Sequence, residues 1–293
     1  MPTQKKNQQP PLTVKDQIAN LKAIGLTIEK ESEAEKFLND VSYFRFVKAF
    51  SEGLKVNGSY NGVTFNQLKQ LYLFNSNFRH LLFEQIEKVE VNLRCRVANY
   101  FSYKYGVLGY KDSNNYKGAV YCTNFLNDIS LEITRNARSP FIENFTKNYV
   151  NGDIPFYALT EIMSFGTLSK FYKNMHPKDK KAIAQSYGVT YTYLESWFEN
   201  IAYVRNICAH YGRLYNAKMT KTPRLFTQDK LNTTSTIRIF STLICLRRLL
   251  NRKKNKQWKG FVNKLDALIK KYPYADIKTM DFPLNWKQIL LSN

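Results

Sequence analysis

Apolar side chains recur at every third or fourth position over most of this chain, which is the spacing of amphipathic helices. The longest such segment runs from Thr64 to Tyr103 and amounts to about ten helical turns. Shorter helices are predicted at 122–136, 140–149, 156–164, 167–175 and 178–187. Because no segment shows sustained strand alternation, the pattern predicts an all-α protein.

The N-terminal part has a different composition. Residues 1–12 contain prolines and no apolar run, as in a flexible arm. Thr13 is a candidate N-cap of a first helix, and a second helix is expected from Glu29. Glycines then mark turns up to residue 62. We therefore expect an N-terminal arm and helical extension over 1–62, and a helical domain over 63–293 that includes a C-terminal basic region.

The composition excludes several classes of protein. The chain has 293 residues, 44% of them hydrophobic, enough to bury a core. No run of eighteen apolar residues is present, so we expect no membrane span. The four cysteines are scattered and the N-terminus has no signal peptide, which favours the reducing cytoplasm. Only three histidines occur, far apart, and the common phosphate-binding glycine loops are missing, so we expect neither metal nor cofactor.

The segment most suited to chemistry is 190–216, TYTYLESWFENIAYVRNICAHYGRLYN. Thr192 and Glu195 have the spacing of a capping box at a helix start. On a helical wheel, Asn206 and His210 share the side opposite an apolar stripe, and Arg205 lies about 140° from His210 on the flank. The stripe is made of Tyr193, Trp197, Ile201, Val204, Cys208 and Tyr211.

This set of side chains suits phosphodiester chemistry. A histidine with its ordinary pKa of about 6.5 exchanges protons at neutral pH, and an arginine binds a phosphate with two parallel hydrogen bonds. The alternative is structural: a surface arginine, and a histidine that caps carbonyls at the helix end. The R-x-x-x-x-H spacing alone does not separate the two.

The chain contains 44 Lys and Arg but only 23 Asp and Glu, which gives a net charge of +21. This excess favours a polyanionic partner, nucleic acid first and an anionic membrane surface second. Residues 201–260 hold fourteen Lys or Arg and one acid, Asp229. Trp258 and Tyr215 are candidates for stacking on unpaired bases. A solvated loop is the alternative for 251–260. The candidate phosphate contacts are Arg213, Lys218, Lys221, Arg224, Arg247, Arg248, Arg252, Lys253, Lys254 and Lys256.

Several blocks together carry a resemblance to a known family. RNICAHYGRLYN resembles the R-x(4–6)-H signature of HEPN ribonucleases. Three further blocks resemble, in the same order, blocks of the bacterial abortive-infection Abi family of the AbiD/AbiF type. They are DVSYFRFVKAF, a long helix whose Ile86, Glu87 or Glu90, Leu93 and Arg94 resemble the family's I-E-x-x-L-R core, and SFGTLSKFY. These blocks span roughly 12–260 of the chain. One departure is that Gly212-Arg213 follows Tyr211, which retains the arginine but not the usual serine.

The resemblance implies a HEPN-like helical bundle that forms a homodimer, with two motifs in one cleft. It implies Arg205 and His210 as the catalytic pair, with Asn206 as a supporting polar residue. It further implies metal-independent cleavage of RNA that leaves a cyclic 2′,3′-phosphate, a role in antiphage defence, a structured noncoding RNA as partner, and kinship with type VI CRISPR ribonucleases. A non-catalytic RNA-binding protein that assembles with its noncoding RNA is the alternative. A DNA-binding regulator is disfavoured because no helix-turn-helix pattern is found.

Overall fold

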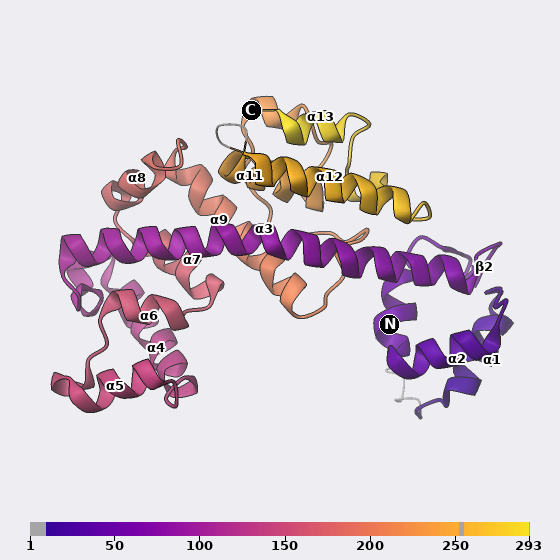
Figure 1. Cartoon of the computed structure of the whole chain (residues 1–293), viewed down its shortest axis with the longest axis horizontal. Coiled ribbons are helices and arrows are strands. Elements are labelled where there is room, and N and C mark those ends of the chain that lie inside the picture. The colour runs from indigo at the N-terminus through magenta and orange to yellow at the C-terminus, as the bar shows by residue number, and fades with distance from the viewer. Residues whose placement is uncertain (1–9, 252–254, 293) are drawn as a thin grey trace, which may run out of the picture. The chain divides into compact units, whose positions relative to one another are not determined.

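The computed structural model describes residues 10–251 and 255–292, and these fold predominantly into helices (Figure 1), which confirms the all-α prediction. The strands among the described residues are β1 (Lys55–Val56) and β2 (Ser59–Tyr60), which pair antiparallel. Lys55 lies opposite Tyr60 in this hairpin. None of the described helices combines the length and the apolar character that crossing a membrane requires.

The chain divides into two compact units. One unit contains residues up to Asn77 together with Leu268–Asp276, and the other contains Phe78–Ala267 and Ile277–Asn293. Both α3 (Phe65–Tyr105) and α12 (Lys256–Lys271) begin in one unit and end in the other. The domain boundary predicted at residue 62 stays a prediction.

The first unit contains α1 (Val14–Ala23), α2 (Glu31–Asp40), a π-helical turn η1 (Phe44–Lys48) and the hairpin. Thr13 caps α1 as predicted, because its hydroxyl accepts the amide hydrogen of Asp16 at 3.2 Å. A close approach explains Gly25, where a Cβ atom would lie 2.5 Å from the carbonyl oxygen of Tyr60. The edge-to-face aromatic cluster of Phe37, Phe46, Phe65 and Tyr72 fills the interior.

The second unit is built on the C-terminal part of α3. Its buried side chains, including Leu82, Ile86 and Leu93, follow the predicted helical period. Each predicted shorter helix is found within a few residues of its expected ends. The helices after α3 are α4 (Ala119–Arg135), α5 (Pro140–Asn148), α6 (Phe156–Ile162), α7 (Phe165–Asn174), α8 (Pro177–Gln185), α9 (Tyr191–Ala209), α10 (Thr227–Lys230), α11 (Ile239–Leu250), α12 and α13 (Trp286–Leu291). Single 3-10 turns lie at Gly109–Lys111, Ser113–Asn115, Val150–Gly152 and Ile277–Met280.

Helix α9 lies at the centre of this packing. Helices α7, α8 and α11 all contact it, and α4 packs on the α6–α7 side. Ser164, in the SFGTLSKFY block, is the N-cap of α7 and accepts the amide hydrogen of Thr167 at 3.1 Å. The rings of Phe101, Phe156 and Phe171 lie 4.7–4.9 Å apart between centroids and join α6 and α7 to α3. Helix α9 is thus held on several sides, which fixes the segment that carries the candidate chemistry.

Candidate functional site at the C-terminal end of helix α9

The end of α9 has the hydrogen bonds of a Schellman motif. The amide of Gly212 donates to the carbonyl of Ile207 at 2.7 Å, and the amide of Tyr211 donates to the carbonyl of Cys208 at 3.3 Å. Tyr211 adopts the left-handed conformation, with φ of 58°. A Cβ atom on Gly212 would lie 2.8 Å from Cγ2 of Ile207. The motif therefore ends the helix at Ala209 and makes His210 its C-cap.

Arg79 of α3 supports this helix end. Its Nη1 donates to the carbonyl of Cys208 at 3.1 Å, and its guanidinium carbon lies 5.6 Å from the ring centroid of Tyr211. The left-handed conformation costs an L-residue about 1–2 kcal/mol, and the cation–π contact offsets part of that cost. No local sequence pattern indicates this role, because Arg79 is 129 positions from Cys208.

Arg205 is held by an ion pair from α3. Its Nε lies 3.3 Å from Oε2 of Glu90, and its guanidinium lies 5.7 Å from the ring centroid of Phe83. The other carboxylate oxygen of Glu90 accepts from Arg94 at 2.9 Å, and Arg94 also donates to the carbonyl of Met163 at 3.0 Å. The terminal amino groups of Arg205 donate to no described residue. The ion pair orients the guanidinium while leaving its outer edge open to a ligand.

His210 and Asn206 lie on the surface. The side chains of both residues are exposed, and neither side chain makes a hydrogen bond to another described residue. The side chains of His210 and Arg205 are therefore not bonded to each other. The wheel placed these two side chains correctly away from the core. The wheel placed Tyr211 on the buried stripe, which is wrong: the helix ends two residues earlier, and Tyr211 is 64% exposed.

The start of α9 also differs from the expectation. The N-cap is Thr190, and not Thr192, which lies within the helix. Glu195 does not close a capping box but pairs with Lys180 of α8 at 2.7 Å. Lys180 is almost fully buried, so its ammonium needs a charged partner more than the helix start needs a cap.

The segment after the motif returns along α9 and is fastened to it through its backbone. Nε1 of Trp197 donates to the carbonyl of Arg224 at 2.6 Å, Nδ2 of Asn200 donates to the carbonyl of Lys221 at 2.7 Å, and the amide of Arg224 donates to Oγ of Ser196 at 2.8 Å. The cationic side chains of this segment at 218, 221 and 224 remain exposed, whereas its apolar side chains, such as Leu214 and Leu225, are buried. We call the exposed cations Lys218, Lys221 and Arg224 the basic strip.

Lys221 has an acidic neighbour. Its Nζ lies 3.0 Å from Oε1 of Glu199, whose other oxygen lies 3.2 Å from Lys173. The hydrogen bond from Lys221, helped by Lys173, lowers the pKa of Glu199 despite its burial. One carboxylate is thus shared by two lysines, which leaves a net positive charge at this point of the strip.

The second predicted basic cluster is largely structural. Arg247 is buried and donates to Asp229 at 2.6 Å and to the carbonyl of Ile289 at 2.9 Å. Arg248 makes two hydrogen bonds of 2.9 Å with the same carboxylate. Both guanidinium groups hold α10 against α11. In this arrangement the buried Arg247 is not accessible to a phosphate, and the single carboxylate of Asp229 is shared by two guanidinium groups, which leaves a net positive charge.

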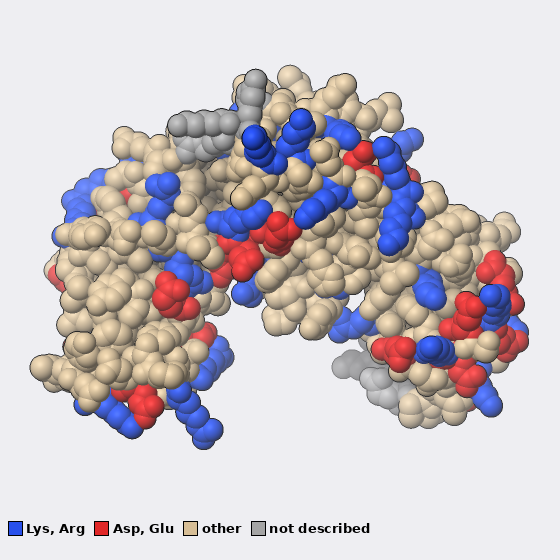
Figure 2. All heavy atoms as spheres, in the orientation of Figure 1, with Lys and Arg blue, Asp and Glu red and all other residues tan. Residues whose placement is uncertain are grey.

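The remaining predicted contacts have mixed outcomes. Trp258 is 1% exposed and donates from Nε1 to the carbonyl of Leu290 at 2.7 Å, so its ring has no free face for a base, and Tyr215 is buried as well. Lys256 is exposed, whereas Arg252, Lys253 and Lys254 lie outside the described residues. Arg213 is partly buried. Lys and Arg side chains gather over α12 in Figure 2.

Other reactive groups of the second unit are inert or structural. Burial raises the pKa of Cys208 to about 12, so its thiol stays protonated and is a poor nucleophile. His176 lies 2.8 Å from the carbonyl of Asn114 and fixes a loop. Among the described residues no cluster of three or more His, Cys, Asp or Glu is placed to hold a metal ion.

A family model described as Abi-like protein matches residues 36–216, more than half of the chain, and the chain therefore belongs to this family. Membership indicates a role in abortive-infection defence against phage. The matched range includes α3, α9 and the Schellman motif, and it ends before the basic strip. No curated protein and no solved structure matches the chain.

Proposed function

We propose that this protein is an RNA-binding HEPN protein of the AbiD/AbiF type and a metal-independent endoribonuclease. The observation that carries the proposal is the end of α9, where an exposed histidine lies five positions after an arginine whose outer edge is open. The ion pair with Glu90 holds the guanidinium of Arg205, and the Schellman motif fixes the backbone of His210 at the same helix end. Fixed catalytic groups lower a barrier because their positioning entropy is lost on folding and not during the reaction.

The proposed reaction is attack of a ribose 2′-hydroxyl on the adjacent phosphorus. His210 takes the hydroxyl proton, the bond from phosphorus to the 5′-oxygen breaks, and a second acid protonates the leaving oxygen. Arg205 donates to the phosphoryl oxygens while negative charge accumulates on them. The products are a 2′,3′-cyclic phosphate and a 5′-hydroxyl.

A homodimer supplies the second acid. One chain offers a single histidine in the motif, while His80 and His176 lie elsewhere on α3 and at the start of α8. In a two-fold assembly that joins the ends of two α9 helices, His210 of each protomer serves as base or acid. Asn206 is exposed on the same face, where its amide can bind a phosphate or the facing protomer.

The basic strip is proposed as the path of the RNA backbone into this site, because the anchors from α9 hold Lys221 and Arg224 along the helix that carries Arg205. Lys256 is proposed as a further contact. The partner RNA is proposed to be a structured noncoding RNA, and cleavage of cellular RNA would stop growth of an infected cell. A protein that acts on RNA in this way belongs in the cytoplasm.

The experiment that tests the activity is incubation of the purified protein with total RNA in EDTA. We expect cleavage products that end in cyclic phosphates, and none with His210→Ala. His80→Ala is the matched control, because His80 is also an exposed histidine.

A non-catalytic RNA-binding role is the second candidate. The observation in its favour is that the charge of Arg205 is already paired with Glu90, which reduces its pull on a phosphate. Bound RNA that stays intact in EDTA and in Mg²⁺ with the wild-type protein would support this candidate.

A further inference from the structure

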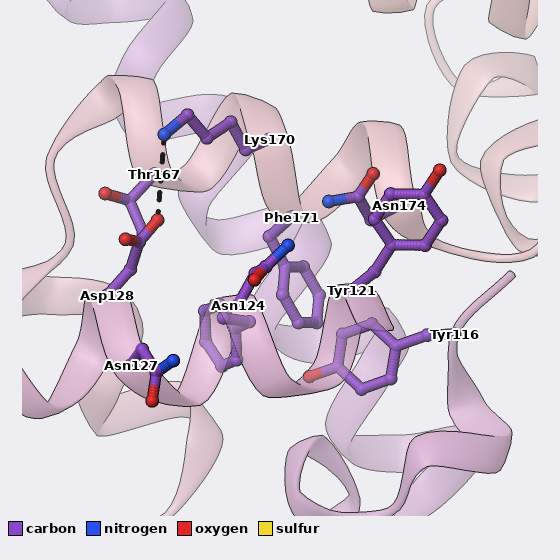
Figure 3. Close-up of a pocket in the computed structure, with 10 residues that line it drawn as sticks. Tyr116, Tyr121, Asn124, Asn127, Asp128, Thr167, Lys170, Phe171 and Asn174 are labelled. Carbon is purple, nitrogen blue, oxygen red and sulfur yellow. Dashed lines mark ion pairs between the residues drawn. The ribbon is translucent and has the colours of Figure 1, made fainter. Parts of the chain in front are cut away.

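A pocket of about 450 Å³ opens between α4 and α7 in the second unit (Figure 3). Its floor is aromatic, formed by the buried rings of Tyr116, Phe125 and Phe171. The volume lies within the range of small-molecule sites in proteins. The backbone of Tyr116 forms a bridge with that of Met175, which ties the segment before α4 to the end of α7. The pocket is therefore preformed by helices and is not a gap between loops.

Primary amides line this pocket. Asn124 lies on α4 and Asn174 ends α7, whereas Asn127, also on α4, turns its amide away from these two (Figure 3). The side-chain amides of Asn124 and Asn174 make no hydrogen bond to other described residues. Each amide offers two donors and one acceptor, so the two present unused hydrogen-bonding groups beside an aromatic floor.

One side chain supplies a stacking surface. Tyr121 is partly exposed and lies beside Asn174 in Figure 3. Nζ of Lys117 lies 4.6 Å from the ring centroid of Tyr121. A flat ring next to amides is how proteins bind unpaired bases, which stack on the ring and pair along their polar edge.

The charged residues that line the edge of the pocket are Lys170 and Asp128, whose charged groups lie 3.7 Å apart. Lys117, next to the pocket residue Tyr116, donates from Nζ to the carbonyl of Lys173 at 3.1 Å and pairs with no acidic side chain among the described residues. Burial and the nearby ammonium of Lys180 lower the pKa of Lys117, and a phosphate placed beside its ammonium would oppose that shift. A phosphate attached to a base in the pocket would meet this charge.

We propose that this pocket binds one unpaired nucleobase, with Tyr121 stacking on the ring and Asn124 and Asn174 pairing with its polar edge. The inference rests on the proposed RNA binding and gives it a second contact point, remote in sequence from the α9 motif. An amide pairs well with the amino group and ring nitrogen of adenine, which makes adenine the base to test first.

The test compares an unpaired hexa-adenylate with a fully paired RNA duplex, both measured by fluorescence anisotropy on His210→Ala protein to prevent cleavage. We expect Asn124→Ala with Asn174→Ala to weaken hexa-adenylate binding about tenfold, as the loss of one to two hydrogen bonds predicts, and to leave duplex binding unchanged. Asn144→Ala, an exposed amide on α5, is the matched control. Tyr121→Leu should weaken the hexa-adenylate by a similar factor.

Unchanged hexa-adenylate binding in the double variant, with an unchanged melting temperature, would overturn the pocket and leave the motif proposal intact. Titration with adenosine 5′-monophosphate tests the pocket independently of RNA binding. If the wild-type protein binds no RNA yet binds this nucleotide in an Asn124-dependent way, the pocket stands and the proposed RNA function fails.

Discussion

Glu90 of α3 contacts Arg205 of α9 at 3.3 Å, although 115 positions separate the two residues. Three other features of α3 converge on the same helix end: the Phe83 ring, the Arg79 guanidinium, and Arg94, which shares the Glu90 carboxylate. The long helix therefore positions the candidate catalytic arginine as well as forming the core. Residues of α3 and α9 that are far apart in the sequence thus form one candidate site.

Replacing Glu90 by Gln should impair cleavage more than binding. The amide keeps the shape of the carboxylate but removes its charge, so Arg205 loses its orientation. We expect the turnover rate on saturating RNA to fall about 10²-fold, the effect of misplacing a catalytic group by about 1 Å. RNA affinity should hold or rise slightly, since a negative charge is lost. Glu87→Gln, on the exposed side of α3, is the control, and equal turnover in both variants would contradict a positioning role.

Replacing Gly212 by Ala should distort the C-terminal end of α9, although Gly212 is not itself a candidate catalytic residue. The new methyl group would lie 2.8 Å from Cγ2 of Ile207 and 3.1 Å from its carbonyl oxygen, so the helix end must shift. We expect a loss of about 1–3 kcal/mol in the free energy of unfolding and a lower cleavage rate. Gly260→Ala is the matched control, because no atom lies within 4 Å of a Cβ there and alanine favours helix. Chemical denaturation of both variants decides the matter.

Neutralising the basic strip should reduce the salt dependence of RNA binding. Each phosphate contact to a single strand contributes about −0.7 to the slope of log affinity against log salt. Replacing Lys218, Lys221 and Arg224 by Ala should therefore make the slope shallower by about 2. The control replaces Lys15, Lys36 and Lys147, which are also exposed but lie elsewhere. An identical slope in both triple variants would remove the strip from the interface.

Arg247→Met should destabilise the fold and leave RNA contacts intact. The variant leaves the buried Asp229 carboxylate with fewer partners, and breaking a buried ion pair lowers the free energy of unfolding by about 3–5 kcal/mol. We expect the melting temperature to fall by about 10 °C. Arg135→Ala removes a surface ion pair of α4 instead and should change little. If Arg247→Met melts like the wild type but binds RNA poorly, Arg247 is an RNA contact after all.

Mixing wild-type chains with an excess of His210→Ala chains tests the composite site. If each cleft needs a histidine from both protomers, mixed dimers are impaired and activity falls faster than the wild-type fraction. Activity in strict proportion to the wild-type fraction, or cleavage by a protein that sediments as a monomer, would refute the dimer model without affecting RNA binding.

Helical periodicity predicted the fold well, because core burial repeats along each helix. It located α3 within two residues at each end and identified Thr13 as a cap. It also placed Asn206 and His210 on the solvent side of α9. These features depend on neighbours within a few residues, which the sequence displays directly.

Features that depend on distant partners were not predictable. Glu195 forms an ion pair with Lys180, so the predicted capping box at Thr192 does not form. Arg247 and Trp258 looked like surface groups in a basic run, yet the C-terminal segment at Ile289 and Leu290 covers both and accepts their hydrogen bonds. Composition shows that a residue is charged or polar, but not which distant carbonyl accepts its hydrogen bond.

The anchors along α9 hold the basic strip by its main chain. Ser196, Trp197 and Asn200 bind amide and carbonyl groups of Lys221 and Arg224, and any residue type supplies those groups except for proline's missing amide. Side chains at 218, 221 and 224 can therefore be exchanged while the path of the backbone stays the same. Among relatives, we expect the anchors to persist while the strip varies with the RNA each protein meets. Substitutions at these three positions would then alter the proposed RNA contact without moving the proposed catalytic groups at the end of α9.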